Sequence, residues 1–190
     1  MTPLFIVLGV VALLALSFVV AYNALVRLRN KVSEAWSGIE VQLGRRHALI
    51  PNLAATVQGY AAHERALFDV VARARALAQA ADGPLQAGQA ETVLGAAVGR
   101  LIAVSESYPQ LRASANFLAL QEELTNTEDE IAGARRIYNG NVQIYNTRLE
   151  SFPANLWAPA FGFAAADLFE AEPGSRVAPQ ASLGAPLNPA

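Results

Sequence analysis

Apolar residues occur along this chain in two patterns, first as one unbroken run and then as seven-residue repeats. Residues 4–21 carry no charged side chain, and Ser17 is their only weakly polar member. Eighteen helical residues rise about 27 Å, close to the roughly 30 Å hydrocarbon core of a bilayer. Tyr22 follows at a position that favours an interfacial aromatic side chain. The pattern predicts a transmembrane anchor over residues 1–22, which contacts lipid through residues 4–21.

The charges that flank this run predict its topology. A cleaved signal peptide, the alternative interpretation, requires a basic segment before the apolar run, and residues 1–5 contain no Lys or Arg. The nearest basic residues, Arg27, Arg29 and Lys31, all follow the run. The positive-inside rule therefore predicts a single-pass protein with its N-terminus outside and the rest of the chain in the cytoplasm.

Seven-residue repeats predict helices through the region after the anchor. A wide apolar stripe of this kind is typical of a helical bundle. Pro51 interrupts the first half and either kinks one long helix or starts a second one. Asp82-Gly83-Pro84 ends this helical first half. The repeat consists of Leu25, Val32, Ile39, Leu53, Tyr60, Leu67 and Ala74.

The second half of the chain repeats this pattern. Residues 85–106 predict a shorter Ala-rich helix, and residues 109–151 predict one long helix because their repeat is unbroken. A capping box at Thr127 and Glu130, which would start a new helix there, is the alternative. The repeat consists of Phe117, Leu124, Ile131, Tyr138, Tyr145 and Phe152. The predicted fold class is all-α: an N-terminal transmembrane helix followed by an up-and-down antiparallel bundle of three to four long helices.

Composition narrows the range of functions. The chain has 14 basic and 16 acidic residues, for a net charge of −2, so we expect no nucleic-acid partner. It contains no Cys, which excludes disulfides and thiolate catalysis. His63-Glu64 lacks the second His of a metal-binding helix, and we interpret His63 as a structural or surface residue. We expect no catalytic residue, metal or cofactor.

Arg45, Arg46 and Asn52 form the candidate partner- or anion-binding site. The two arginines precede Pro51, and a helix that began at Pro51 would present free backbone N–H groups near Asn52 beside them. The alternative is a solvated helix face, with Arg46 extending its charge out of the apolar stripe.

The region after Phe152 is rich in large apolar residues without helical periodicity, and residues 173–190 are predicted to be disordered. Trp157, Phe161, Phe163 and Phe169 are its candidate docking surface for a protein partner or a membrane. The alternative is a strap that folds back on the bundle, within a domain of residues 23–172. Before it, the Tyr138-Asn139 and Tyr145-Asn146 pairs lie one heptad apart, which predicts tyrosines in the core and asparagines bonded between helices.

Short motifs occur in order along most of the chain. They are Tyr22-Asn23-Ala24-Leu25-Val26, Glu34-Ala35-Trp36-Ser37, Leu49-Ile50-Pro51-Asn52-Leu53, Gly59-Tyr60-Ala61, Tyr108-Pro109, Tyr138-Asn139, Tyr145-Asn146, Phe152-Pro153, Phe161-Gly162-Phe163 and Phe169-Glu170. Taken together, these motifs resemble the LemA family over roughly residues 4 to 172. The resemblance implies a bacterial, membrane-anchored antiparallel helical bundle in a family with no established enzymatic activity. A relative from magnetosome gene clusters suggests membrane organisation.

Two functional hypotheses follow for a protein of the bacterial cell membrane. The first is a non-enzymatic scaffold or adaptor that presents its bundle to other membrane or envelope proteins, or forms a homo-oligomer. The alternative is a membrane-organising or membrane-remodelling protein that self-assembles on lipid. A hydrolase or metalloenzyme is the least supported hypothesis, because no nucleophile motif or phosphate-binding loop is present.

Overall fold

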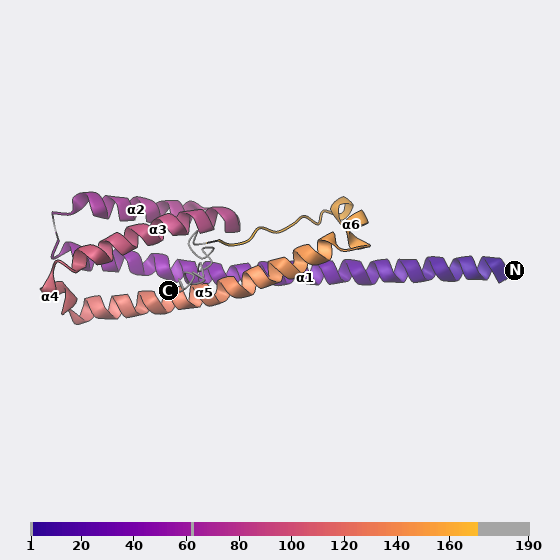
Figure 1. The fold of residues 1–190 in the computed structure, drawn as a ribbon, viewed down its shortest axis with the longest axis horizontal. Coiled ribbons are helices and arrows are strands. Elements are labelled where there is room, and N and C mark those ends of the chain that lie inside the picture. The colour runs from indigo at the N-terminus through magenta and orange to yellow at the C-terminus, as the bar shows by residue number, and fades with distance from the viewer. Residues whose placement is uncertain (1, 62, 171–190) are drawn as a thin grey trace, which may run out of the picture.

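The computed structural model describes residues 2–61 and 63–170, which form an elongated helical bundle with the N-terminus at one end (Figure 1). Every regular element in these two ranges is a helix, which confirms the all-α prediction. The predicted disordered tail, residues 173–190, lies outside the described residues. The elements are α1 (Thr2–Gln58), α2 (Arg65–Ala80), α3 (Gly83–Ser105), α4 (Pro109–Arg112), α5 (Ala115–Glu150), α6 (Ala154–Trp157) and the 3₁₀ helix η1 (Ala158–Phe161).

Helix α1 runs from the apolar run into the bundle without a break, so Pro51 does not start a new helix. A proline lacks the N–H that would bond the carbonyl four residues earlier, here that of His47. Arg75 of α2 replaces that donor, since its Nε lies 2.7 Å from the His47 carbonyl oxygen. A side chain from a neighbouring helix thus compensates for the backbone hydrogen bond that Pro51 removes.

The first turn of the bundle occurs at residues 59–64, not at Pro51. Backbone hydrogen bonds from Tyr60 and Ala61 to the Val57 carbonyl close this turn. Tyr60 is 45% exposed, so its predicted place in the core stripe is wrong, and the buried residue of the turn is Ala61. The turn lets α2 return antiparallel to α1, and α1, α2, α3 and α5 form the predicted up-and-down bundle (Figure 1).

The second half differs from its prediction at both ends of the long helix. Phe152, the last residue of the predicted repeat, follows the end of α5 at Glu150 and is 78% exposed, so its predicted place in the apolar stripe is wrong. Leu111 of α4 is fully buried, and the extended backbone of Ser114 separates this short turn from α5. The helix therefore begins at Ala115 and not at residue 109. It continues through Thr127, whose hydroxyl donates to the Glu123 carbonyl oxygen at 2.8 Å within the helix. The capping-box alternative at Thr127 is wrong.

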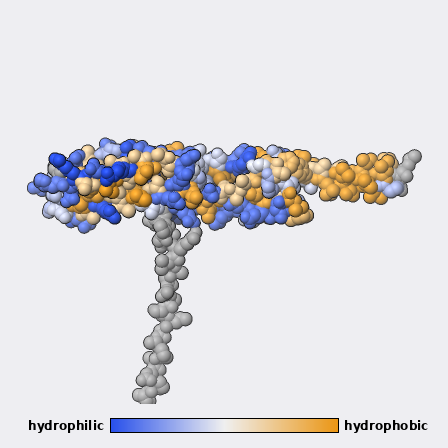
Figure 2. Space-filling view, turned by 90° about the horizontal axis from the view of Figure 1, so that it is seen from above, coloured by the Kyte–Doolittle hydropathy of each residue, from blue (hydrophilic) through white to orange (hydrophobic). Residues whose placement is uncertain are grey.

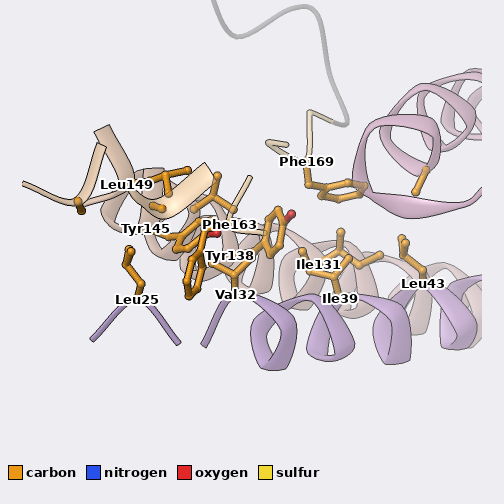
Figure 3. Close-up of a cluster of buried hydrophobic side chains, with 14 residues drawn as sticks. Leu25, Val32, Ile39, Leu43, Ile131, Tyr138, Tyr145, Leu149, Phe163 and Phe169 are labelled. Carbon is orange, nitrogen blue, oxygen red and sulfur yellow. The ribbon is translucent and has the colours of Figure 1, made fainter. Parts of the chain in front are cut away.

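Two clusters of buried apolar residues make up the core. One lies toward the turns and joins all four long helices, with Leu53, Val71, Leu94 and Phe117 among its members. The other lies nearer the N-terminal end and joins α1 to α5 and to the residues after α6. Figure 3 shows this second cluster, in which side chains of α1 face those of α5 with Phe163 and Phe169 beside them; its labelled members are Leu25, Val32, Ile39, Leu43, Ile131, Tyr138, Tyr145, Leu149, Phe163 and Phe169.

The C-terminal strap, residues 152–170, folds back along the bundle. It begins with α6 and η1, turns at Gly162, whose φ of 76° favours glycine, and continues without regular structure toward α3. Phe163 and Phe169 of this strap are buried in the core. The interpretation of this region as a strap that folds back is therefore confirmed.

Candidate functional site

The strongest concentration of buried charge lies between α1 and α3. Glu91 is 2% exposed; its Oε2 accepts a hydrogen bond from Nη1 of Arg46 at 2.7 Å, and its Oε1 lies 2.6 Å from Nε2 of His47. The direction of the hydrogen bond between His47 and Glu91 depends on the tautomer of the imidazole ring. Arg46 Nη2 also contacts Glu128 of α5 at 2.8 Å. The side chains of Arg46, His47, Glu91 and Glu128 constitute the buried ion network.

Arg46 is only 7% exposed, so the interpretation that it extends its charge into solvent is wrong. Its neighbour Arg45 points to the surface, where its Nη2 contacts Glu123 at 2.6 Å and its Nη1 contacts Glu130 at 3.3 Å. The hydrogen bond to Glu123 and the two carboxylate charges raise the pKa of Arg45. Both arginines therefore face carboxylates of the bundle itself.

Asn52 does not join these arginines at a helix start. It lies on the exposed side of α1, and its carbonyl accepts a hydrogen bond from the Thr56 hydroxyl at 2.8 Å within the helix. Because α1 continues through Pro51, the helix start that motivated the anion site is not formed. An anion- or partner-binding role for Arg45, Arg46 and Asn52 stays a prediction.

An open cavity of about 590 Å³ lies beside the buried ion network. Its wall carries both signs of charge, from Arg46 and Arg135 on one hand and Glu91, Glu128 and Asp129 on the other. Within residues 2–61 and 63–170, no group of three His, Cys, Asp or Glu side chains is placed to hold a metal ion. The cavity is thus a recess of mixed polar and apolar lining between α1, α3, α5 and the strap.

The two Tyr–Asn pairs of α5 hold the strap by its backbone. Asn146 donates to the Ala166 carbonyl and accepts from the Ala166 N–H, both at 2.9 Å. Asn139 makes the same pair of bonds with Phe169, at 3.1 and 2.9 Å. The asparagines therefore bond the strap, and the prediction that they bond between helices is wrong.

The tyrosines extend this arrangement, which we call the Tyr–Asn ladder. Tyr145 donates to the Ala164 carbonyl at 2.9 Å, and Tyr138 donates to the Asp167 carbonyl at 2.7 Å. Each step covers seven residues of helix, about 10.5 Å, and three residues of extended chain, about 10 Å, so the spacings match. Both tyrosines are 2% exposed, which confirms their predicted position in the core. Burial raises the pKa of Tyr145, and burial with the Asp167 charge raises that of Tyr138 to about 12.

The four candidate docking residues divide into two pairs. Phe163 and Phe169 are core residues; Phe169 packs edge-on against Trp36 with ring centroids 5.6 Å apart. Trp157 is half-buried and Phe161 is 53% exposed, and both lie against Phe18 of α1. The accessible part of the predicted surface is therefore at the start of the strap.

A model of the LemA family matches residues 35–182. This chain belongs to the LemA family. Its relatives include Magnetosome protein MamQ 2 of Paramagnetospirillum magneticum, which is 28% identical over 193 residues, covering 88% of this chain and 71% of the relative. Magnetosome protein MamQ of Magnetospirillum gryphiswaldense is 26% identical with the same coverage. Protein LemA of Metamycoplasma hominis is 27% identical over 160 residues, covering 82% of this chain and 71% of the relative.

Three residues of this LemA-family chain that organise the site were not singled out from its sequence. Glu91 carried a signal, because it precedes Leu94, Val98 and Leu101 at helical spacing and so places a charge on an apolar stripe. His47 and Gly88 carried no such signal. His47 contacts Glu91, and Gly88 leaves room for the backbone of Glu170, and both of these neighbours come from other segments of the chain.

Proposed function

We propose that this LemA-family protein is a membrane-anchored, non-enzymatic scaffold or adaptor of the bacterial envelope. The observation that carries the proposal is the continuity of α1. Its first part is long and apolar enough to cross a membrane, and its apolar side chains from Leu4 to Leu16 are exposed. Figure 2 shows this end as a nearly continuous hydrophobic surface, in contrast to the mixed surface of the bundle.

The second part of α1 supports retention of the anchor. Leu25, Val32 and Ile39 of the same helix are buried in the core cluster shared with α5 and the strap. The basic residues that follow the apolar run favour the orientation with the N-terminus outside and the bundle in the cytoplasm. Anchor and bundle then form one continuous body that holds a helical surface near the membrane.

The internal chemistry supports a non-catalytic role. Catalytic acids, bases and nucleophiles must be accessible to substrate and must lie within hydrogen-bond reach of the group that reacts. In this bundle, Glu91 faces Arg46 and His47, and the Tyr–Asn ladder faces backbone groups of the strap. These groups act as structural contacts.

The outer face of α1 and α5 exposes apolar side chains to a partner. Ile137 and Ile144 are exposed and lie one and two heptads beyond Glu130, which contacts Arg45 of α1. Val41, also exposed, lies one turn before Arg45. Val41, Ile137 and Ile144 therefore share the outer α1–α5 face, and we propose them as the contact surface of the scaffold.

The alternative function is membrane organisation by self-assembly on lipid. It is favoured by the same outer face, because a stripe on long antiparallel helices can pair with a second copy. The names of two relatives, both magnetosome proteins, are compatible with such a role. In an adaptor, a different protein covers the outer face; in the alternative, a second copy of this chain covers it.

Fractionation of cells tests the anchor. We would express the full chain and compare it with Leu8→Arg/Leu13→Arg, using Val41→Arg as the control. Each arginine near the centre of a spanning helix opposes insertion by about 2.5–3.5 kcal/mol. We expect the full chain and Val41→Arg in carbonate-washed membranes and the double variant in the soluble fraction. Retention of the double variant in the membrane would show that α1 is not the anchor.

Photo-crosslinking tests the scaffold. A photoreactive amino acid at Val41 or Ile137 of the full chain in cells is compared with the same group at Leu77, which is exposed on α2. Cross-links to a different protein at the first two sites, absent at Leu77, support the adaptor. Cross-links between copies support the alternative, and equal labelling at all three sites refutes the proposed face.

A further inference from the structure

The start of the strap lies beside the end of the apolar run of α1. We call residues 152–161, which contain α6 and η1, the foot. Its Trp157 and Phe161 rings lie 4.7 and 5.5 Å from the ring of Phe18, measured between centroids. The Tyr22 ring lies 5.9 Å from that of Phe161. Figure 1 shows α6 next to α1 at the level where the bare N-terminal part of that helix begins.

The foot has one buried side and one exposed side, and both are apolar. Ala154 and Ala158 are buried against the bundle. On the other side, Phe152 is 78% exposed, Leu156 is 73% exposed and Phe161 is 53% exposed. No charged residue occurs from residue 151 to residue 166. Large adjacent apolar side chains with no charged residue among them indicate a surface made for an apolar environment.

Its surroundings have the composition of a membrane interface. Trp and Tyr side chains favour the headgroup level, and Trp157 stacks on Tyr22 with centroids 6.3 Å apart. Basic residues follow within a few turns of α1; Arg27 is six residues beyond Ala21, about 9 Å along the helix. The guanidinium of Arg29 lies over the Phe163 ring at 5.2 Å, which joins this basic region to the strap.

We propose that the foot inserts into the boundary between headgroups and acyl chains of the leaflet from which α1 emerges. Apolar side chains of segments that lie in this boundary are buried about 5–10 Å into it. The occupant of the exposed face is therefore lipid, since that face is continuous with the apolar surface of the anchor. The foot is then a second point of attachment beside the anchor, at the end of the bundle that faces the membrane. This inference rests on the proposed anchor.

Site-directed spin labelling tests the foot, because the chain has no Cys and single cysteines can be placed at will. The full chain is reconstituted into vesicles of phosphatidylcholine and phosphatidylglycerol. Labels are placed at Leu156 in the foot, Leu13 in the anchor and Val41 on the bundle, all exposed side chains that can be replaced without opening the core. Collisions with oxygen report lipid exposure, and collisions with a water-soluble nickel chelate report aqueous exposure.

We expect the labels at Leu13 and Leu156 to favour oxygen and the label at Val41 to favour the nickel chelate. A Leu156 label that behaves like that at Val41, with Leu13 in lipid, would overturn the foot and leave the anchor intact. A Leu156 label shielded from both reagents would also overturn it, because protein would then cover the face. An aqueous Leu13 label would refute the anchor, and with it the inference.

A second variant separates insertion from local folding. Phe152→Ser/Leu156→Ser alters two exposed side chains and leaves the ring contacts of Phe161 with Phe18 in place, and the label then sits at the exposed Asn155. We expect this label to move from lipid-like to aqueous collision rates in the double variant, while its mobility stays that of an ordered site. Unchanged collision rates would contradict insertion.

Discussion

Removal of the Glu91 carboxylate should destabilise the bundle more than removal of any surface carboxylate. In Glu91→Ala, Arg46 loses its contact at 2.7 Å and His47 loses its contact at 2.6 Å, although both side chains stay buried. Removing one partner of a buried ion network costs about 3–5 kcal/mol; Arg46 keeps its contact with Glu128 at 2.8 Å, but its Nη1 donor and the His47 ring lose their buried acceptor. For a chain of this length, 1 kcal/mol shifts Tm by about 2–4 °C, so we expect a decrease of about 6–20 °C.

The measurement is thermal unfolding of the full chain in detergent, followed by far-ultraviolet circular dichroism and by the fluorescence of its two tryptophans, Trp36 and Trp157. Glu130→Ala is the matched control, since it removes a carboxylate from the half-exposed pair with Arg45. Surface pairs contribute about 0–1 kcal/mol, so its Tm should change by no more than about 4 °C. Equal effects of Glu91→Ala and Glu130→Ala would refute the reasoning.

A compensating variant tests the electrostatic cause. Arg46→Met/His47→Leu/Glu91→Leu replaces the buried charges with apolar side chains and also removes Arg46 Nε, a buried atom without a hydrogen-bond partner. Replacing a whole buried network is often neutral or stabilising by about 1–4 kcal/mol. We expect this triple variant to unfold at or above the Tm of the natural sequence. A Tm as low as that of Glu91→Ala would indicate that shape, and not charge, holds this site.

Three further predictions concern the strap. In Asn139→Asp, the lost amide donor and the new charge face the Phe169 carbonyl, so hydrogen exchange at residues 166–169 should accelerate, whereas Asn126→Ala on an exposed part of α5 should leave it unchanged. In Gly88→Ala, a Cβ would lie 2.5 Å from the backbone oxygen of Glu170, so we expect a loss of about 1–3 kcal/mol. Gly99→Ala on the same helix meets no atom within 4 Å and should gain up to about 1 kcal/mol; urea unfolding compares the two. Finally, the raised pKa of Tyr138, about 12, means that the unfolded chain loses this proton first, so stability should fall as pH rises from about 10 toward 12. Tyr138→Phe should remove that part of the decrease in alkaline urea unfolding, and an unchanged slope would contradict it.

The periodic part of the core could be predicted from sequence because each contact there depends on local spacing. Val32 and Ile39 in one half, and Ile131 and Tyr138 in the other, all lie in the cluster that joins α1 to α5. A heptad repeat places such residues on one face of a helix whatever the partner helix is. The repeat also led to an error, because Tyr60 fits it and yet lies in the turn.

Contacts between distant segments could not be predicted in the same way. The effect of Pro51 depends on Arg75, whose guanidinium satisfies the carbonyl that proline leaves unbonded. The partners of Asn139 and Asn146 are backbone groups of the strap, and a backbone group carries no sequence signal. The strap itself was expected from its aromatic residues, but its path depends on the ladder and on the missing side chain of Gly88.

With the proposed anchor in a bilayer, the continuity of α1 makes the whole helix a rigid arm that tilts about the membrane. From Ala21 to Gln58 the helix extends about 56 Å, and no turn interrupts it. Spanning helices tilt by about 20° on average, and such a tilt displaces the far end of the bundle by about 19 Å along the membrane plane. A change in bilayer thickness that altered the tilt would thus be amplified into a displacement at the α1–α2 turn. The size of this displacement is set by the length of this single helix.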